Sequence, residues 1–443
     1  MLELTITSLS HAAEGIGRHE GRAIFAPFAL PGETVRVEIV TEKKNFARAR
    51  LLEIITPSPE RVAPRCPHHF SLEAPPSPVE DGGEPPTLRS GGASHGSGVR
   101  GLGACGGCHL QHLAYPAQLK FKQQTLVEQL TRVGGFADPP VRPTLPSPAP
   151  FNYRSHVQFS LTPAGQLGLR AAHSHEVIPI HECHQLRPPL AELFPQVKID
   201  PDYAPEIERV TLRVGAEDEL LVVLESDADA PEMELDLPVS AALLRPDGAA
   251  LTLAGDDHLV ETVRGRTFQV SAGSFFQVNI PVAEQMVEFV LSGLALRGGE
   301  TVLDLYCGVG LFSAFIAPIA GRVIGVEAYA PAVSDAAVNL DEFENVEIYE
   351  APAEDVLPGL NLSLDAVVLD PPRTGCAPAV VEALAASRAS RLVYVSCDPA
   401  TFARDARRLA AGGYVLEWVQ PLDMFPQTYH VECVAKFGLQ PKI

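Results

Sequence analysis

The sequence predicts an α/β protein in three parts: a small N-terminal β-barrel, a mixed α+β middle domain and a C-terminal doubly wound, Rossmann-like domain. Three observations lead to this prediction. Residues 1–55 consist of short alternating runs broken by Gly and Pro. Residues 151–270 mix strands and turns, and apolar strands alternate with helical stretches from about residue 276 onward.

The N-terminal barrel is expected over residues 1–60. Its strands are the runs LELTITSL, RAIFAPFAL, TVRVEIV and ARARLLEII. Aromatic and basic side chains are interleaved here, namely Phe25, Phe28 and Phe46 with Lys43, Lys44, Arg48 and Arg50. Such a mixture suits a face that binds single-stranded nucleic acid. Core aromatics with a solvated basic rim would explain it equally well.

The middle domain is expected over residues 61–270. Residues 71–103 are rich in Pro, Gly and Ser and predict a disordered insert. The 443-residue chain has a net charge of −21, but the stretch from Asp200 to Glu261 alone holds 17 acidic and 3 basic residues. Because the excess is concentrated there, the overall charge argues only weakly against an RNA partner.

The C-terminal domain is expected over residues 271–443. The strands TVLDLYC, RVIGVE, DAVVLDPP and LVYVSC alternate with helical stretches, which is typical of a doubly wound parallel sheet. No signal peptide or membrane-spanning stretch is visible, so a cytoplasmic protein with reduced cysteines is expected.

A cofactor site is expected where TVLDLYCGVGLFS turns from strand to helix. Gly308 and Gly310 allow the backbone to approach a ligand closely. Glu327 ends the next strand, where an acid can accept hydrogen bonds from both ribose hydroxyls. The loop lacks the third glycine of the dinucleotide fingerprint and has no Walker lysine. These residues favour S-adenosylmethionine over NAD or ATP, with a dinucleotide left as the alternative.

Three further features lie at strand ends or on a late strand. DPPRTG (370–375) has Arg373 where amino-group methyltransferases carry an aromatic residue, which disfavours chemistry at an exocyclic amine. Cys397 ends the strand LVYVSC, and Glu432 lies in a late apolar strand. Taken singly, each has a plain structural explanation: a strand terminator, a packed thiol and a solvent-facing acid.

The motifs DLYCGVG, LDPPRTG, VYVSCDPATFARD and DMFPQTYHVECVA together resemble the uracil-5 RNA methyltransferases. YRSHVQFS and FFQVN look like middle segments of the same family. The resemblance implies that Cys397 is the nucleophile and Glu432 the base. It also implies contacts to S-adenosylmethionine from Gln277, Tyr306, Glu327 and Asp370.

This chemistry explains the residue types. Carbon 5 of uracil is a poor nucleophile, so a thiolate first adds to carbon 6 and makes an enolate that can accept the methyl group. A base then removes the carbon-5 proton and the thiolate is eliminated. We therefore expect the surroundings of Cys397 to lower its pKa.

Four other cysteines predict a metal centre. Cys105 and Cys108 are spaced as CGGC, and Cys66 and Cys183 complete a set of four. By residue type alone, the nearby histidines slightly favour zinc over an iron–sulfur cluster. The segment CGGCHLQHLAYPAQLKFKQ, however, resembles the 4Fe-4S segment of the family's ribosomal-RNA branch, which implies a 4Fe-4S cluster. The insert 71–103 separates Cys66 from the other ligands more widely than is usual.

The barrel resembles a TRAM domain, which together with the cluster implies RNA as partner and 23S rRNA as substrate. Three alternatives remain: a tRNA uridine-5 methyltransferase, a cytosine-5 RNA methyltransferase and a non-catalytic RNA-binding assembly factor. A monomer without membrane contact is expected.

Overall fold

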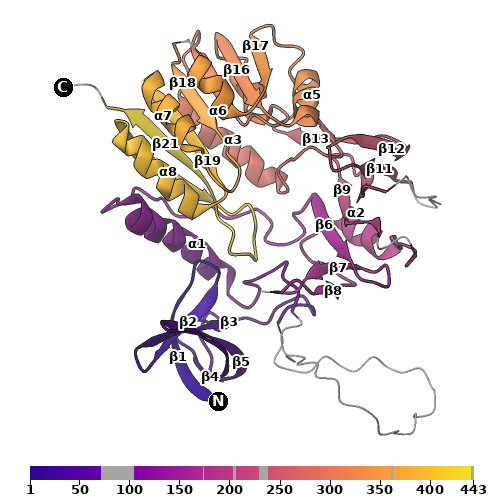
Figure 1. Ribbon diagram of the computed structural model, residues 1–443, viewed down its shortest axis with the longest axis vertical. Helices are drawn as coiled ribbons and strands as arrows, with labels where there is room; N and C mark the ends of the chain where they lie inside the picture. Colours follow the sequence, from indigo (N-terminus) through magenta and orange to yellow (C-terminus); the bar gives the residue numbers. More distant parts are fainter. Residues whose placement is uncertain (71–103, 173, 203–205, 229–237, 361–362, 441–443) are drawn as a thin grey trace. The chain divides into compact units, whose positions relative to one another are not determined.

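The computed structural model describes residues 1–70, 104–172, 174–202, 206–228, 238–360 and 363–440 (Figure 1). The predicted insert 71–103 lies outside the described residues. The chain forms two compact units. The N-terminal unit comprises Met1–Ala114 and Leu169–Ile180, and the C-terminal unit comprises Tyr115–Gly168 and His181–Ile443.

The N-terminal unit contains the predicted barrel. Its strands close in the order β1-β2-β3-β5-β4 and span Leu2–Leu9 (β1), Glu14–His19 (β2), Arg22–Pro27 (β3), Thr34–Glu42 (β4) and Phe46–Thr56 (β5). Alternate side chains fill the centre, among them Leu4, Ile24 and Val35. This period of two is what the sequence pattern predicts for a half-buried strand. The short strand β8 (Val177–Pro179) belongs to the same unit.

The barrel's aromatic and basic residues divide into two groups. Phe28 stacks on Phe70 at 4.6 Å, whereas Phe25 and Phe46 meet edge to face at 5.9 Å on the outside. Arg48 and Arg50 pair with Glu14 and Glu38. Much of the positive charge expected for an RNA face is therefore balanced within the barrel itself.

The middle part of the C-terminal unit is built on sheet strands that lie in the order β12-β11-β10-β9-β6, followed by the start of β7. The strands are β6 (His156–Leu161), β7 (Leu167–Arg170), β9 (Arg209–Val214), β10 (Leu220–Glu225), β11 (Ser240–Leu244) and β12 (Ala250–Ala254). Strands β10 and β11 pair in parallel, whereas the pairs β6–β9, β9–β10 and β11–β12 are antiparallel. Helix α2 (Pro188–Leu193) and the helical turn Phe194–Gln196 follow β8, and β13 (His258–Val263) and β14 (Arg266–Ser271) form a separate hairpin.

The C-terminal sheet has seven strands in the order β17-β16-β15-β18-β19-β21-β20. They span Thr301–Leu305 (β15), Arg322–Glu327 (β16), Val346–Glu350 (β17), Ala366–Leu369 (β18), Arg391–Ser396 (β19), Tyr414–Leu422 (β20) and Glu432–Leu439 (β21). The first five strands in this order are parallel, and β21 runs antiparallel between β19 and β20. The order reverses beside β15, where open sheets bind ligands. The predicted doubly wound fold is confirmed.

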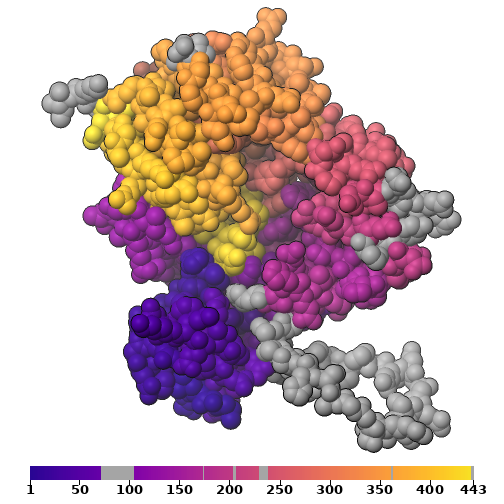
Figure 2. Space-filling model, viewed as in Figure 1, coloured from indigo at the N-terminus to yellow at the C-terminus, as the bar shows by residue number. Residues whose placement is uncertain are grey.

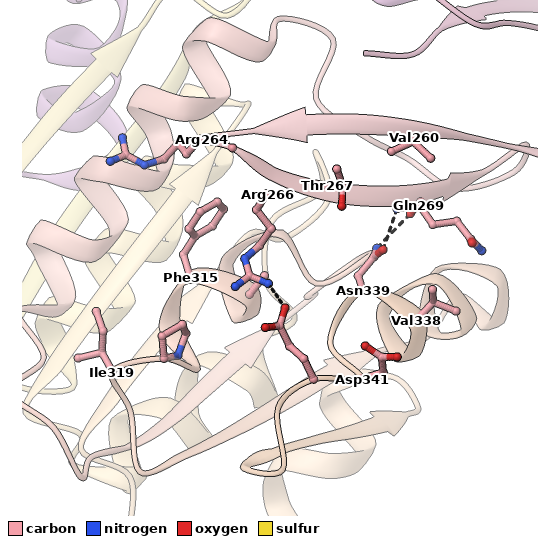
Figure 3. A pocket seen from close by; sticks show the side chains of 14 residues that line it. Val260, Arg264, Arg266, Thr267, Gln269, Phe315, Ile319, Val338, Asn339 and Asp341 are labelled. Atoms are coloured by element: carbon pink, nitrogen blue, oxygen red, sulfur yellow. Dashed lines mark hydrogen bonds and ion pairs between the residues drawn. The ribbon is translucent and has the colours of Figure 1, made fainter. Parts of the chain in front are cut away.

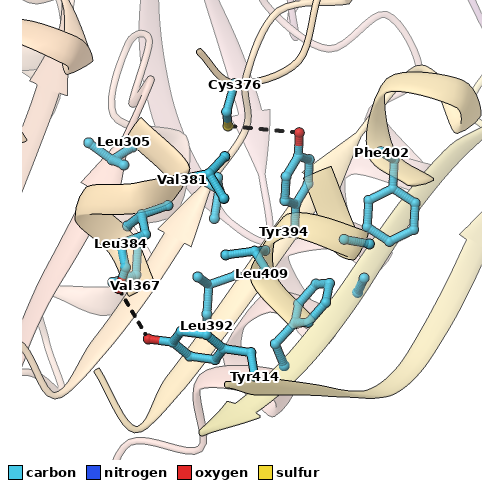
Figure 4. Packing of buried hydrophobic residues seen from close by; sticks show 14 of the residues in the cluster. Leu305, Val367, Cys376, Val381, Leu384, Leu392, Tyr394, Phe402, Leu409 and Tyr414 are labelled. Carbon is cyan, nitrogen blue, oxygen red and sulfur yellow. Dashed lines mark hydrogen bonds between the residues drawn. The ribbon is translucent and has the colours of Figure 1, made fainter. Parts of the chain in front are cut away.

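Helices cover both faces of this sheet (Figure 1). They are α1 (Tyr115–Gln129), α3 (Ile280–Leu294), α4 (Leu311–Ile316), α5 (Ala330–Asn339), α6 (Ala353–Val356), α7 (Pro378–Ser387) and α8 (Pro399–Ala411), with single turns at Leu130–Gly134 and Leu357–Gly359. On one face, Leu392 and Tyr394 of β19 pack with Phe402 and Leu409 of α8 (Figure 4). The continuous apolar runs of the central strands follow from burial on both faces.

Candidate active site

A pocket of about 880 Å³ lies at the carboxyl edge of the C-terminal sheet. Its lining includes all six side chains that the sequence predicts for the site: Gln277, Tyr306, Glu327, Asp370, Cys397 and Glu432. The space-filling view shows a hollow bordered by red, orange and yellow residues (Figure 2), the same stretches of sequence that line the pocket.

The sheet topology brings four of these residues to one edge. Tyr306, Asp370 and Cys397 each directly follow a parallel strand, and Glu327 is the last residue of β16. Glu432 is the first residue of β21, which runs antiparallel to β19 with Ser396 opposite Cys433. Because β21 is reversed, its beginning lies beside the end of β19. The nucleophile and base implied by the resemblance, Cys397 and Glu432, thus lie at adjoining ends of two paired strands.

The glycine loop is shaped to admit a ligand. Gly308 has φ +55°, and a Cβ added there would meet nothing within 4 Å. Its amide donates to Oε2 of Glu327 at 3.0 Å, and the amide of Tyr329 donates to Oε1 at 2.8 Å. The Glu327 carboxylate is therefore held in place on the pocket wall. Fixed acceptors beside an open loop fit the ribose of S-adenosylmethionine.

Cys397 lies in an environment that opposes ionisation. Burial, then the negative charges of Glu432 and Asp370, raises the pKa of the thiol to about 12, while Arg373 acts in the opposite direction. The expectation of a lowered pKa is wrong for the protein without substrate. Burial of the thiol is the main physical reason, and the two neighbouring carboxyl groups add to it.

Both carboxyl groups near Cys397 are also buried in surroundings that disfavour their charged forms. Burial raises the pKa of Asp370 to about 7. Burial and Asp370 raise the pKa of Glu432 well above its usual value, opposed by the cations Arg373 and Lys122. A carboxyl whose pKa lies near or above neutrality is typical of a group that exchanges a proton during a reaction.

Helix α8 fixes the position of the Cys397 turn. Asp398 caps this helix by accepting hydrogen bonds from the amides of Ala400 and Thr401, at 3.0 and 2.8 Å. Thr401 also donates its hydroxyl to the carbonyl of Arg373 at 3.1 Å. The start of α8 therefore connects the Cys397 turn with the DPPRTG loop.

The sequence did not predict several other lining residues. From the sequence, Arg373 is only a charged group near the site. Phe425 and His430, whose rings meet edge to face at 5.8 Å, are not predicted to line it. Both stand in the motif DMFPQTYHVEC, nine residues or fewer from Glu432. Proximity to Glu432 was the one available signal.

The four cysteines of the predicted metal centre fall in both units. Cys66, Cys105 and Cys108 belong to the N-terminal unit and Cys183 to the C-terminal unit. The carbonyl of His68 accepts a hydrogen bond from the amide of Cys105 at 2.8 Å, which brings the segment of Cys66 beside the CGGC turn. The amide of Gly107 donates to the sulfur of Cys105 at 3.4 Å, an arrangement that suits a thiolate ligand. Within the described residues, no group of three or more His, Cys, Asp or Glu side chains is placed to hold a metal ion.

A second cavity, of about 740 Å³, lies between the β13–β14 hairpin and the ends of α4 and α5 (Figure 3). Its two arginines, Arg264 and Arg266, pair with Glu288 and Glu342. Asn339 is engaged by the backbone of Gln269. The six catalytic and cofactor-binding residues predicted from the sequence all line the other pocket.

Comparison with known proteins agrees with this geometry. A family model described as TRAM domain matches residues 1–52, and one described as tRNA (Uracil-5-)-methyltransferase matches residues 252–437. No helix in the described parts of the chain is long and apolar enough to cross a membrane.

Several relatives match over almost the full length. An uncharacterised RNA methyltransferase of Nostoc sp. is 33% identical over 98% of this chain and 95% of its own length. One of Streptomyces avermitilis is 35% identical over 98% of this chain and 97% of its own length. The crystal structure of the Pyrococcus abyssi tRNA (uracil-54, C5)-methyltransferase with S-adenosyl-L-homocysteine has a TM-score of 0.71 at 25% identity, covering 98% of this chain and 100% of that one. The chain therefore belongs to the S-adenosylmethionine-dependent RNA methyltransferases of the uracil-5 family, with an N-terminal TRAM domain.

Proposed function

We propose that the protein transfers a methyl group to carbon 5 of a uridine in RNA, with 23S rRNA as substrate, through a covalent adduct with Cys397. The observation that carries the proposal is the convergence of Cys397, Glu432 and Asp370 in one pocket with the Gly308 loop. S-adenosylmethionine would supply the methyl group as a sulfonium, held by Gln277, Tyr306, Glu327 and Asp370.

The chain's own residues account for the remaining steps. The Cys397 thiolate adds to carbon 6 of the uracil to give an enolate, and carbon 5 of this enolate accepts the methyl group as the demethylated donor leaves as S-adenosylhomocysteine. The Glu432 carboxylate then removes the carbon-5 proton, the electron pair restores the double bond between carbons 5 and 6, and the thiolate leaves. Because the target base must leave its stack to enter the pocket, a single-stranded or loop uridine is favoured.

Activation of Cys397 is tied to substrate binding in this scheme. Burial and the two acidic neighbours keep the free thiol protonated. A cationic sulfonium beside Asp370 offsets that negative charge and favours the thiolate. The reactive form of Cys397 would thus be produced only when the methyl donor is in place.

A tRNA uridine is the second candidate substrate, favoured by the tRNA (uracil-54, C5)-methyltransferase to which the chain is similar. The test is to map 5-methyluridine in ribosomal and transfer RNA from strains with and without the gene. Loss from one 23S rRNA position supports the proposal. Loss from tRNA alone assigns the second substrate, and no loss from either RNA rejects both.

We further propose that Cys66, Cys105, Cys108 and Cys183 hold a 4Fe-4S cluster, with zinc as the alternative. The thiolate-compatible geometry of the CGGC turn supports this assignment. Iron and sulfide in equal amounts after anaerobic purification are expected, and stoichiometric zinc would contradict the cluster. We also propose a division into residues 1–60, 61–270 and 271–443, a monomeric state and a cytoplasmic location.

A further inference from the structure

Helix α1 contributes a buried cation beside the catalytic edge of the sheet. The side chains of Lys122 and Asp423 are both 0% exposed, and the Lys122 Nζ donates to Oδ1 of Asp423 at 2.5 Å. The same Nζ donates to the carbonyl oxygen of Phe425 at 2.9 Å. A fully buried lysine is rare because its desolvation is costly, so a paired one calls for an explanation.

The partner of Lys122 lies in the loop that leads to Glu432. This loop, residues 423–431, joins β20 to β21. Five consecutive loop residues accept or donate hydrogen bonds with groups outside the two strands. They are Asp423 with Tyr115, Met424 with Asn279, Phe425 with Lys122, Pro426 with Tyr153 and Gln427 with Gln118.

Three of the five contacts come from one face of α1. Tyr115, Gln118 and Lys122 are three and four residues apart and therefore share one side of the helix. The Tyr115 hydroxyl donates to Oδ2 of Asp423 at 2.7 Å. The side-chain amide of Gln118 donates to Oε1 of Gln427 at 2.9 Å, and Oε1 of Gln118 accepts from the backbone amide of Gln427 at 3.1 Å. Helix α1 thus holds the loop along much of its length.

Lys122 also acts on Glu432 through its charge. Its ammonium favours the ionised form of the buried Glu432, against the opposing effects of burial and Asp370. Arg373 is the other cation that acts in this direction. Within the same loop, His430 is neutral at physiological pH, because burial lowers its pKa to about 4.

Building on the proposed function, we infer that Lys122 is a positioning residue for proton removal: it fixes the loop before Glu432 and supplies a buried positive charge that favours the carboxylate form of this base. Addition of Cys397 and transfer of the methyl group do not need this carboxylate as a base. Loss of Lys122 should therefore slow the last step of the reaction selectively.

The test compares two RNA substrates. In 5-fluorouridine RNA a fluorine replaces the proton that Glu432 would remove, so the enzyme is trapped as a covalent adduct whether or not the base works. In uridine RNA the adduct resolves only if the base works. Lys122→Met removes the ammonium and keeps most of the stem. Lys122→Arg keeps the charge, and Lys120→Met removes an exposed lysine from the same helix as a control.

For Lys122→Met we expect adduct formation with 5-fluorouridine RNA at a rate close to that of the wild type. Turnover of uridine RNA should fall at least about 10-fold, with a methylated Cys397–RNA intermediate accumulating, since a positioned base typically contributes a factor of 10² or more. The acid limb of the pH–rate profile should move to higher pH, because Glu432 then loses its proton less readily. Lys122→Arg should restore part of the turnover, and Lys120→Met should resemble the wild type.

Unchanged turnover in Lys122→Met would overturn the inference, and so would an equal loss of trapping and turnover in a folded variant. Should this variant not fold, the neutral pair Lys122→Met/Asp423→Asn is measured in the same two assays, because replacing both buried charges is better tolerated than removing one. If the double variant also fails to fold, Lys122 is a residue required for folding, and its role in proton removal is rejected. A wild-type enzyme that forms no adduct with 5-fluorouridine RNA contradicts the proposed function instead, so the two failures are distinct.

Discussion

The carboxylate of Asp405 accepts a hydrogen bond from the backbone amide of Cys376 at 2.8 Å. The side chain of Asp405 is 0% exposed. It also accepts from the hydroxyl of Tyr394 at 3.0 Å and from Nε of Arg404 at 2.9 Å. Arg404 in turn donates to the carbonyl of Thr374. Helix α8, which begins just after Cys397, therefore also holds the loop that carries Asp370.

Replacing Asp405 by Ala should destabilise the C-terminal unit. The Cys376 amide and the Tyr394 hydroxyl would both be buried without this partner, at a cost of about 3 kcal/mol. Urea unfolding followed by the fluorescence of Trp418, the one tryptophan of the chain, measures the effect. Arg407→Ala changes an exposed residue of the same helix and should alter the free energy of unfolding by less than about 0.5 kcal/mol. Equal stability of the two variants would contradict this role of Asp405.

Replacing Cys397 by Ala should abolish methyl transfer and leave binding of S-adenosylmethionine within about twofold, because the thiol acts on the RNA base and not on the donor. Calorimetric titration with S-adenosylhomocysteine and transfer of labelled methyl groups measure the two properties. Substantial methyl transfer by this variant would rule out a covalent route through Cys397.

Replacing Glu432 by Gln should stall the reaction after methylation. The amide keeps the shape of the side chain but cannot take the carbon-5 proton, so the Cys397–RNA bond persists. A denaturing gel with labelled RNA should show a protein-linked band that the wild type does not accumulate. Absence of the band, together with normal turnover, would assign the base to another residue.

The reactivity of Cys397 should depend steeply on pH. With a pKa of about 12, the thiolate fraction of the ligand-free protein increases about 10-fold for each pH unit between 7 and 9. Removing a negative neighbour lowers the pKa and increases the thiolate fraction, so Glu432→Gln should accelerate alkylation, most clearly at high pH where Glu432 is ionised. Mass spectrometry of the peptide containing Cys397 after brief iodoacetamide treatment gives the rate. A rate that levels off below pH 8 would show an already activated thiol.

Much of the site could be predicted from the sequence because parallel strands bring their carboxyl ends to one edge. That rule places Glu327, Asp370 and Cys397 at one edge once the strands are recognised, whereas the roles of Tyr306, Asp370 and Cys397 required the family resemblance. Glu432 required the resemblance, since nothing local shows that the last strands reverse direction. The barrel followed from period-two alternation in the same direct way.

Other features depend on contacts between distant parts of the chain. Lys122 and Asp423 are separated by 301 residues, and no local pattern indicates their pairing. The direction of the Cys397 pKa shift depends on burial and on charges from two other strands. The sequence likewise gives no sign that Arg48 and Arg50 of the barrel form ion pairs with glutamates of other strands.

Cys397 should direct methylation to carbon 5 of uridine. The most direct measurement is the release of tritium from RNA labelled at carbon 5 of uracil, compared with methyl incorporation in the same reaction. We expect one tritium released for each methyl group transferred by the wild type, and neither event with Cys397→Ala. Methyl transfer without tritium release would contradict this expectation.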